Sequence, residues 1–205
     1  MSGRGRFITF EGGEGGGKTT QTQLLLDVLR QRGIAAIATR EPGGAPGAEE
    51  IRNLLVTGET GRWDPMTEAV LHFAARQEHV ARTIRPALAA GTWVVCDRFV
   101  DSTMAYQGYA QGLGRDKVEG LARAVLGELK PDLTIVLDLP VESGLARERA
   151  KDRYARMGED FHRTVRDAFL DIAKREPGRC VVIDATQPIE AVSGAIARAV
   201  QQRLL

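Results

Sequence analysis

Five short runs of apolar residues alternate along the chain with segments of helical periodicity. The runs cover residues 6–10, 34–39, 92–96, 133–137 and 180–183. Each run is continuous rather than alternating, which is typical of strands that are covered on both faces of a parallel sheet. In the helix predicted over residues 20–32, leucine and valine side chains share one face, and Gly33 ends the helix. The succession of strands and helices predicts an α/β fold with a doubly wound parallel sheet and right-handed crossovers.

Composition and charge limit the kinds of partner. The 205 residues are 43% hydrophobic and 27% charged, which predicts one domain over residues 1–205 with one sizeable core. A formal net charge of +1 argues against a nucleic-acid polymer or an anionic membrane as partner. No run approaches the ~18 apolar residues of a membrane span, and the N-terminal MSGRGRF lacks the apolar core of a signal peptide. Cys96 and Cys180, each in a β-branched run, predict buried thiols in a reducing compartment, so we expect a cytoplasmic protein.

The stretch GGEGGGKTT, residues 12–20, lies between the first predicted strand and the first predicted helix. It fits the P-loop pattern in the context that this pattern requires. Its glycines let consecutive backbone N–H groups turn toward one anion, Lys18 adds a cation near the transferred phosphate, and Thr19 offers a hydroxyl to Mg²⁺. A glycine-rich helix cap is the alternative, and the correctly placed Lys-Thr pair disfavours it. We expect ATP to contact Gly12, Gly13, Glu14, Gly15, Gly16, Gly17, Lys18, Thr19 and Thr20.

The P-loop does not identify the phosphoryl acceptor, because GTPases, motor ATPases and small-molecule kinases share it. The guanine-reading string Asn-Lys-x-Asp does not occur in the sequence. Transfer to a second bound substrate predicts further arginines that hold another anion. Such arginines stand at or after the predicted strand ends and in helical segments: Arg40, Arg52, Arg76 and Arg98.

Three ordered motifs carry a family resemblance: FEGGEGGGKTT, TREPGG with a following EEIR, and DRFVDSTMAYQG. Over nearly its full length the sequence resembles the bacterial thymidylate kinases. The resemblance implies a P-loop kinase fold, in which helices surround a five-stranded parallel sheet and a short mobile lid covers the site, and usually a homodimer. It also implies Mg²⁺ as cofactor, ATP and dTMP as substrates, and direct in-line transfer of the γ-phosphoryl group to dTMP for dTTP biosynthesis, without a protein nucleophile.

The same resemblance implies roles for individual residues. Arg52, Arg76 and Arg98 would hold the acceptor phosphate, with Arg76 also at the thymine edge. Thr103 and Gln107 would lie near the base. Tyr106 would lie beneath the deoxyribose, where it crowds a 2′-hydroxyl, and Glu14 near the 3′-hydroxyl. Asp97 and Thr19 would orient Mg²⁺, and Lys18, Asp97, Arg98 and Arg153 would carry the catalysis. Each of these positions also has a purely structural interpretation. The arginines could be solvated, Asp97 and Arg98 could form a strand-end ion pair, Tyr106 could be a core aromatic, and the polar residues could lie on the surface.

One position shortly before Arg76 departs from the family pattern. His72 occupies the position, four residues before Arg76, where many family members have a base-stacking phenylalanine, and Phe73 follows it. Because helical separations of three and four residues both give neighbouring side chains, we expect Phe73 to stack on the base with His72 beside it. His79 and His162 have no metal-ligand spacing and are interpreted as surface or packing residues.

The P-loop has no arginine, since Gly15 and Gly16 occupy its middle. The resemblance then implies that a basic lid supplies the missing charge, which we place at about residues 147–158, where RERAKDRYAR carries five basic residues. We predict that Arg153 reaches the transferring phosphoryl group with Arg149 in support. The family's acidic residue two positions after the Asp-Arg pair is Ala155 here, and a solvated helix face with ion pairs is the alternative for the neighbouring basic residues.

Two other functions remain open on the sequence alone. The first is a kinase of another nucleoside monophosphate or small molecule, because a single methyl group is worth only ~1 to 3 kcal/mol in an apolar pocket. The second is a nucleotide-dependent switch that hydrolyses ATP without an acceptor. The arginines at the acceptor end disfavour the switch.

Overall fold

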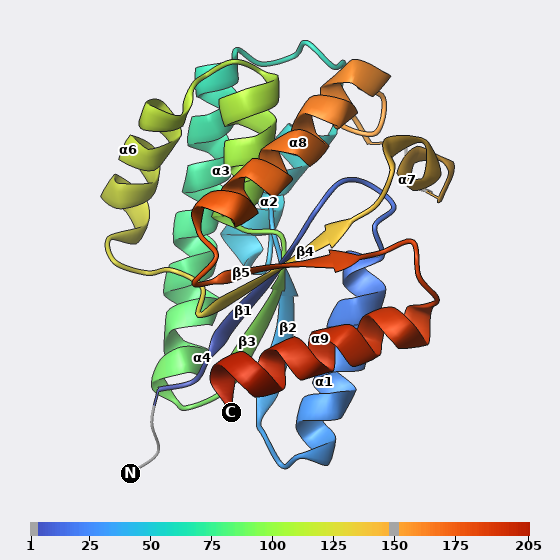
Figure 1. Ribbon diagram of the computed structural model, residues 1–205. Coiled ribbons are helices and arrows are strands. Elements are labelled where there is room, and N and C mark those ends of the chain that lie inside the picture. The colour runs from blue at the N-terminus through green and yellow to red at the C-terminus, as the bar shows by residue number, and fades with distance from the viewer. Residues whose placement is uncertain (1–3, 148–151) are drawn as a thin grey trace.

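The computed structural model describes residues 4–147 and 152–205, and a five-stranded parallel sheet lies at its centre (Figure 1). The strands are β1 Phe7–Glu11, β2 Ala36–Arg40, β3 Trp93–Asp97, β4 Leu133–Asp138 and β5 Cys180–Asp184. Their order across the sheet is β2-β3-β1-β4-β5, and all neighbours pair in parallel. The predicted five-stranded sheet is confirmed. The edge strands β2 and β5 are only partly buried, so the expected cover on both faces holds for the three central strands.

Helices cover both faces of the sheet (Figure 1). The helical segments are α1 Lys18–Gln31, α2 Pro46–Val56, α3 Pro65–His79, the π-helical η1 Val80–Ile84, α4 Arg85–Ala89, α5 Val100–Thr103, the π-helical η2 Met104–Ala110, α6 Arg115–Leu126, α7 Val141–Arg147, α8 Glu159–Arg175 and α9 Ile189–Leu204. The predicted helix over residues 20–32 is α1, and Gly33 follows it with a φ of 72°. None of the described helices is long and apolar enough to cross a membrane.

Each face of the sheet has its own core. On one face, Ile8 and Phe10 of β1 pack with Leu25 of α1 and Ile196 of α9. On the other face, Phe7 of β1 lies in the cluster that includes residues of η1, α4 and α6, while β4 packs with α3, η2 and α8. Cys96 and Cys180 are buried free thiols, as predicted. Because both faces of the central strands are covered, the strands hold the loops at their carboxyl ends in fixed positions.

The strand order places the functional loops. β1 lies between β3 and β4, and Phe10 is in register with Asp97, so the loops after β1 and β3 leave the sheet side by side. In an open parallel sheet, this end is where ligands bind. Arg98, directly after β3, has a φ of 68°, a left-handed backbone conformation that costs energy for any residue with a Cβ. Such a conformation directs attention to Arg98 as a functional residue.

Candidate active site

A cleft of about 590 Å³ opens at the carboxyl ends of the strands. Its walls come from the P-loop, the segments after β2 and β3, α2, α3 and the chain after α7. Most predicted site residues line it: Glu14, Gly15, Gly16, Gly17, Lys18, Thr19, Thr20, Arg52, Arg76, Asp97, Arg98, Thr103, Tyr106 and Gln107. Gly12, Gly13, Phe73 and Arg153 do not line it. The cleft thus joins the predicted donor and acceptor residues in one space.

Close approach of the backbone explains the glycine at position 12 of the P-loop. Gly12 has a φ of 132°, and a Cβ there would lie 2.5 Å from the carbonyl oxygen of Leu137 on β4. Lys18 Nζ donates to the carbonyls of Gly13 at 2.6 Å and Gly12 at 3.2 Å. Burial and the charge of Arg98 lower the pKa of Lys18. The lysine therefore closes the loop on itself, and its ammonium group lies where a phosphate bound by the loop N–H groups would meet it.

Two oxygen ligands suited to Mg²⁺ meet at the mouth of the P-loop. Thr19 Oγ1 donates to Asp97 Oδ2 at 2.7 Å, which joins α1 to the end of β3. No cluster of three or more histidine, cysteine, aspartate or glutamate side chains suited to a metal occurs within residues 4–147 and 152–205. A hydroxyl and a carboxylate fit a hard cation that takes its other ligands from water and phosphate, which is how Mg²⁺ usually binds. The pair therefore fits Mg²⁺ bound together with a nucleotide.

Arg98 connects the P-loop to the segment after β3. Its Nη1 donates to the Gly12 carbonyl at 3.0 Å, and its Nη2 forms an ion pair with Glu14 at 3.0 Å. Glu14 also accepts a hydrogen bond of 2.7 Å from the Tyr106 hydroxyl, and the Arg98 guanidinium lies 5.2 Å from the Tyr106 ring centroid. Burial by itself would raise the pKa of Glu14. The positive charges of Arg98 and Lys18 outweigh burial, and the pKa is lowered to about 2. Glu14 is therefore an anion at neutral pH, and it fixes both Arg98 and Tyr106.

Glu11, at the end of β1, holds the segment after β3 in place. The buried carboxylate at the end of β1 accepts the backbone N–H of Phe99 at 2.8 Å and the Ser102 hydroxyl at 2.6 Å. Burial, together with the nearby carboxylate of Asp101, raises the pKa of Glu11 to about 8. Glu11 was not among the predicted site residues. The structure assigns it the task of holding the strained turn at Arg98.

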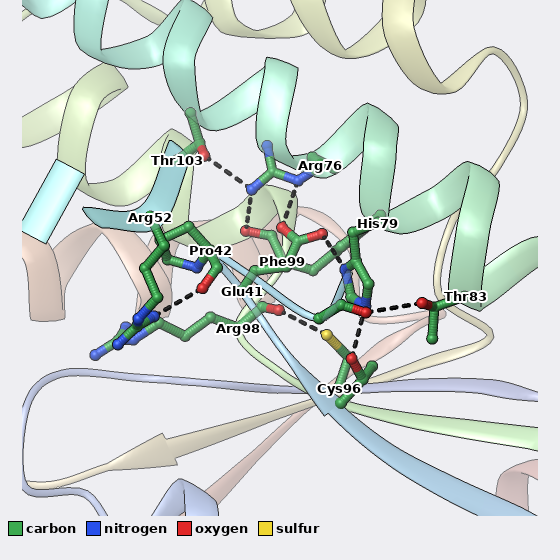
Figure 2. A network of polar contacts seen from close by, with 12 residues as sticks. Glu41, Pro42, Arg52, Arg76, His79, Thr83, Cys96, Arg98, Phe99 and Thr103 are labelled. Atoms are coloured by element: carbon green, nitrogen blue, oxygen red, sulfur yellow. Dashed lines mark hydrogen bonds and ion pairs between the residues drawn. The ribbon is translucent and has the colours of Figure 1, made fainter. Parts of the chain in front are cut away.

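Arg76 is 2% exposed and lines the cleft. Figure 2 shows its side chain within a network of polar contacts. Its Nε pairs with Glu41 at 2.7 Å, and its Nη2 donates to the Phe99 carbonyl and the Thr103 hydroxyl, each at 3.0 Å. The guanidinium lies over the Phe73 ring, 4.8 Å from its centroid. Nη1 is buried without a hydrogen-bond partner within the part of the chain that the structure describes. An unpaired buried donor costs about 1–3 kcal/mol, which an acceptor atom on a ligand would offset.

Glu41 and His79 extend this network behind Arg76 (Figure 2). His79 Nδ1 lies 3.0 Å from the second carboxylate oxygen of Glu41, and its Nε2 lies 2.6 Å from Thr39 Oγ1. His79 is fully buried and is a packing residue. It also orients the carboxylate of Glu41. The role of Glu41 was missed, although it follows β2 directly at the strand end. The glutamate fixes the direction in which Arg76 points.

Arg52 and Arg40 add further positive charge to the cleft. Arg52 Nη1 donates to the Pro42 carbonyl at 2.7 Å, and Arg40 pairs with Glu49 at 3.1 Å. Burial and the charge of Arg40 lower the pKa of Arg52, with a smaller contribution from Arg98. Mutually repelling guanidinium groups around one opening create a positive potential that an anion would relieve.

Phe73, which we predicted to stack on the base, does not line the cleft. Phe73 belongs to the buried core at 2% exposure, where its ring supports Arg76, while the neighbouring His72 lines the cleft. The helical turn of α3 directs the two side chains to different sides, and only the side of His72 faces the opening. His72 Nε2 lies 2.9 Å from the Tyr154 hydroxyl. Burial, and then the charges of Arg76 and Arg153, lower the pKa of His72 to about 3, so the ring is neutral at physiological pH.

This pKa predicts a difference in acid stability between the wild type and His72→Phe. The folded-state pKa of about 3 lies below the ordinary value of 6.5, so the unfolded chain takes up a proton first as the pH falls through 6.5. The stability that the lowered pKa of His72 contributes is therefore fully present above pH 6.5 and is lost as the pH falls toward 3. Between pH 7 and about 4.5 we expect the wild type to lose about 1–2 kcal/mol more unfolding free energy than His72→Phe, measured by urea unfolding. Equal losses would mean that folding leaves the pKa of His72 unchanged.

The predicted contact between Arg153 and the transferring phosphoryl group is not formed in this arrangement. Arg153 is fully buried and pairs with the buried Glu68 on α3, outside the cleft. Arg149, its predicted support, lies outside the described residues. Arg147, at the end of α7, lines the cleft instead. No local pattern indicated Glu68 as a partner of Arg153, but Glu68, His72 and His79 share one face of α3, and that polar face was the available signal.

The segment at the end of β5, residues 184–188, forms a turn that we expect to line the adenine of ATP. Asp184 accepts hydrogen bonds from the Thr186 backbone and hydroxyl and from the Gln187 amide. These contacts explain why the pKa of Asp184 is lowered. The contact with adenine stays a prediction.

A P-loop that leads into a cleft lined by a second group of arginines defines a phosphotransferase for two small anionic substrates.

The family model described as thymidylate kinase matches residues 10–196. A thymidylate kinase of Caulobacter vibrioides is 52% identical over 204 residues, with 98% of each chain covered. One of Bradyrhizobium sp. (strain ORS 278) is 50% identical over 208 residues, covering 98% of this chain and 92% of the relative. The crystal structure of thymidylate kinase from Ehrlichia chaffeensis superimposes with a TM-score of 0.80 at 35% identity, covering 97% of this chain and 100% of that one. The chain belongs to the thymidylate kinase family.

Proposed function

We propose that this enzyme transfers the γ-phosphoryl group of ATP to dTMP, giving ADP and dTDP for dTTP biosynthesis. The observation that carries the proposal is one cleft in which the P-loop lysine and a second set of arginines face a common space. Arg98 lies between the two ends, because it binds Gly12 and Glu14 of the P-loop while its guanidinium lies 5.2 Å from the ring centroid of Tyr106 on the acceptor side. Family membership selects dTMP as the acceptor.

At the donor end, the P-loop N–H groups and Lys18 would hold the β- and γ-phosphates. Thr19 and Asp97 would hold Mg²⁺, whose charge, when it is bound, offsets that of the phosphates. Arg147 is the described basic residue of the 147–158 segment that lines the cleft. We propose that it supplies positive charge on the donor side, which the arginine-free P-loop lacks.

At the acceptor end, Arg52 and Arg98 would hold the dTMP phosphate. The free Nη1 of Arg76 would meet a base or phosphate oxygen. His72, neutral and at the cleft wall, would stack on thymine in place of the phenylalanine common in the family. The remaining contacts follow the roles implied by the sequence. Thr103 and Gln107 lie near the base, Tyr106 crowds a 2′-hydroxyl, and Glu14 lies near the 3′-hydroxyl.

The chemistry asks little of the protein beyond positioning. A phosphate oxygen of dTMP attacks the γ-phosphorus of ATP, and the bond from that phosphorus to the oxygen bridging to the β-phosphate breaks. ADP leaves with the bonding electrons. Two phosphate anions that approach each other repel, so cations that hold both in line lower the barrier. Lys18 and Arg98 are placed to do this, and no protein nucleophile takes part.

We also propose that the enzyme works as a homodimer in the cytoplasm. Two large apolar side chains are exposed on the adjacent helices α2 and α3, Leu54 at 41% and Val70 at 46%. Exposed apolar groups on paired helices suit an interface between copies of the chain. The two buried free thiols, Cys96 and Cys180, are compatible with a reducing compartment.

The test is ADP production from Mg-ATP with dTMP, dUMP, dCMP, dGMP, CMP or AMP, beside a reaction without acceptor. We expect strong production with dTMP and little in the reaction without acceptor. Preference for another nucleotide would overturn the acceptor assignment. Equal production without any acceptor would support a hydrolytic switch instead.

A further inference from the structure

A buried carboxylate, Glu68, lies behind the nucleoside end of the cleft and is fully inaccessible to solvent. Its Oε1 accepts hydrogen bonds from the side-chain amides of Gln107 and Gln111, each at 2.7 Å, and from the Tyr154 hydroxyl at 3.0 Å. Its Oε2 pairs with Arg153 Nη2 at 2.5 Å. One anion thus joins α3, η2 and the chain that follows residue 151.

Arg153 supplies the matching charge and ties the chain to the α2–α3 connection. Its Nε donates to the Leu55 carbonyl at 3.0 Å, and its Nη1 donates to the Thr60 carbonyl at 3.1 Å. Nη2 donates to the Tyr154 hydroxyl at 3.0 Å, and the backbone N–H of Arg153 donates to the Val56 carbonyl at 3.1 Å. Every nitrogen of the guanidinium is therefore engaged. An arginine held in this way would have to give up a buried ion pair to reach a phosphate.

The pair holds side chains that line the cleft. Gln107 and Tyr154 bond directly to Glu68, and His72 bonds to the Tyr154 hydroxyl at 2.9 Å. The Tyr154 ring also meets the Tyr106 ring edge-on, with centroids 5.7 Å apart. These side chains come from different elements of the chain, so local structure alone does not fix their relative positions. The buried pair of Glu68 and Arg153 fixes them.

We propose that Glu68 and Arg153 form a positioning pair for the acceptor nucleoside, and that Arg153 does not act on the transferred phosphoryl group. The inference rests on the proposed function, because it assigns the nucleoside end of the cleft to dTMP. Loss of either partner leaves the other charge buried and uncompensated, and the surrounding side chains must move to admit water or another partner. The wall formed by Gln107, Tyr154 and His72 would then lose its fixed shape.

The test compares Glu68→Gln, Arg153→Met and the double variant with the wild type. Calorimetry gives the Kd for dTMP without ATP, and steady-state kinetics give kcat and the KM for each substrate. We expect each single variant to raise the dTMP Kd about tenfold and to leave the ATP KM within about twofold. Because the two residues act as one unit, the double variant should bind dTMP no more weakly than the weaker single variant. Loss of kcat in Arg153→Met alone, with an unchanged dTMP Kd, would place Arg153 on the phosphoryl group and overturn the proposal.

Tyr154→Phe keeps the test decisive if the charge variants do not fold. It removes the hydroxyl shared by Glu68, Arg153 and His72 but keeps the ring, and it should raise the dTMP Kd several-fold. An unchanged Kd would contradict the proposal. Asp27→Asn, in an exposed pair with Arg30 on α1, is the matched control and should bind dTMP as the wild type does. A wild type that fails to bind dTMP would refute the proposed function itself, whereas normal dTMP binding by every variant would refute only the positioning pair.

Discussion

Replacing Arg98 with methionine is expected to lower kcat/KM for dTMP by at least about 10³-fold. The guanidinium contacts the P-loop, through the Gly12 carbonyl and Glu14, and also the segment after β3, through the Ser102 hydroxyl and the Tyr106 ring. Its loss removes charge that opposes the repulsion between two phosphates, and it also frees Glu14 to repel the incoming anion. Both effects are larger in the transition state than in the ground state, so kcat should fall along with kcat/KM. Initial rates of ADP formation over a range of dTMP concentrations give both constants.

The control for this experiment is Arg30→Met, which removes an exposed arginine of α1 paired with Asp27. It should keep wild-type kinetics, because exposed ion pairs of this kind contribute little. Circular dichroism should show that Arg98→Met remains folded. A folded Arg98→Met variant within tenfold of wild-type kcat/KM would contradict the assigned role.

Arg76→Met is expected to raise the KM for dTMP about 10²-fold and to leave the KM for ATP nearly unchanged. Arg76 is held by Glu41 and by the Phe99 carbonyl, and its remaining Nη1 is the donor left for the acceptor nucleotide. A fixed, buried guanidinium binds an anion or a carbonyl without further ordering of its side chain, so its contribution is large. Steady-state kinetics with each substrate varied in turn give the two KM values.

Loss of Arg76 also leaves Glu41 buried without its partner, which can cost about 3–5 kcal/mol of stability. The double variant Arg76→Met, Glu41→Gln removes this charge, and it should recover stability but not dTMP affinity. Arg82→Met is the matched control, since Arg82 lies six residues further along the same helical run and pairs with Glu78 in solvent. Recovery of the dTMP KM in the double variant would show that Arg76 acts only through the fold.

The fold could be predicted from the sequence because its signals are local. Continuous apolar runs marked all five strands, and the motif at residues 12–20 marked the loop between β1 and α1. The order of the strands depends on contacts between distant segments, which periodicity does not encode. The partial exposure of β2 and β5 follows from that order, since both are edge strands.

The site was predictable where residues belong to continuous motifs, as with Lys18, Thr19, Asp97, Arg98 and Tyr106, all of which line the cleft. It was not predictable where a helix turn decides which neighbour faces the opening. Phe73 and His72 differ by one position, and the packing of Phe73 against Arg76 fixes the outcome.

Arg153 shows a second limit of sequence reasoning. A run of basic residues indicates a solvated or substrate-binding segment, but the buried Glu68 that holds Arg153 lies 85 positions away on α3. An ion pair between such distant residues has no local signal. Glu41 is similar, because its partners Arg76 and His79 come from a different element.

The central claim is that the terminal phosphoryl group of ATP passes to dTMP within this cleft. The most direct measurement follows ATP labelled in its γ-phosphate, incubated with Mg²⁺ and dTMP, with the nucleotides separated by chromatography. The account predicts that label appears in dTDP, one equivalent for each ADP formed, with little free phosphate. Label released as inorganic phosphate at the same rate with and without dTMP would contradict it.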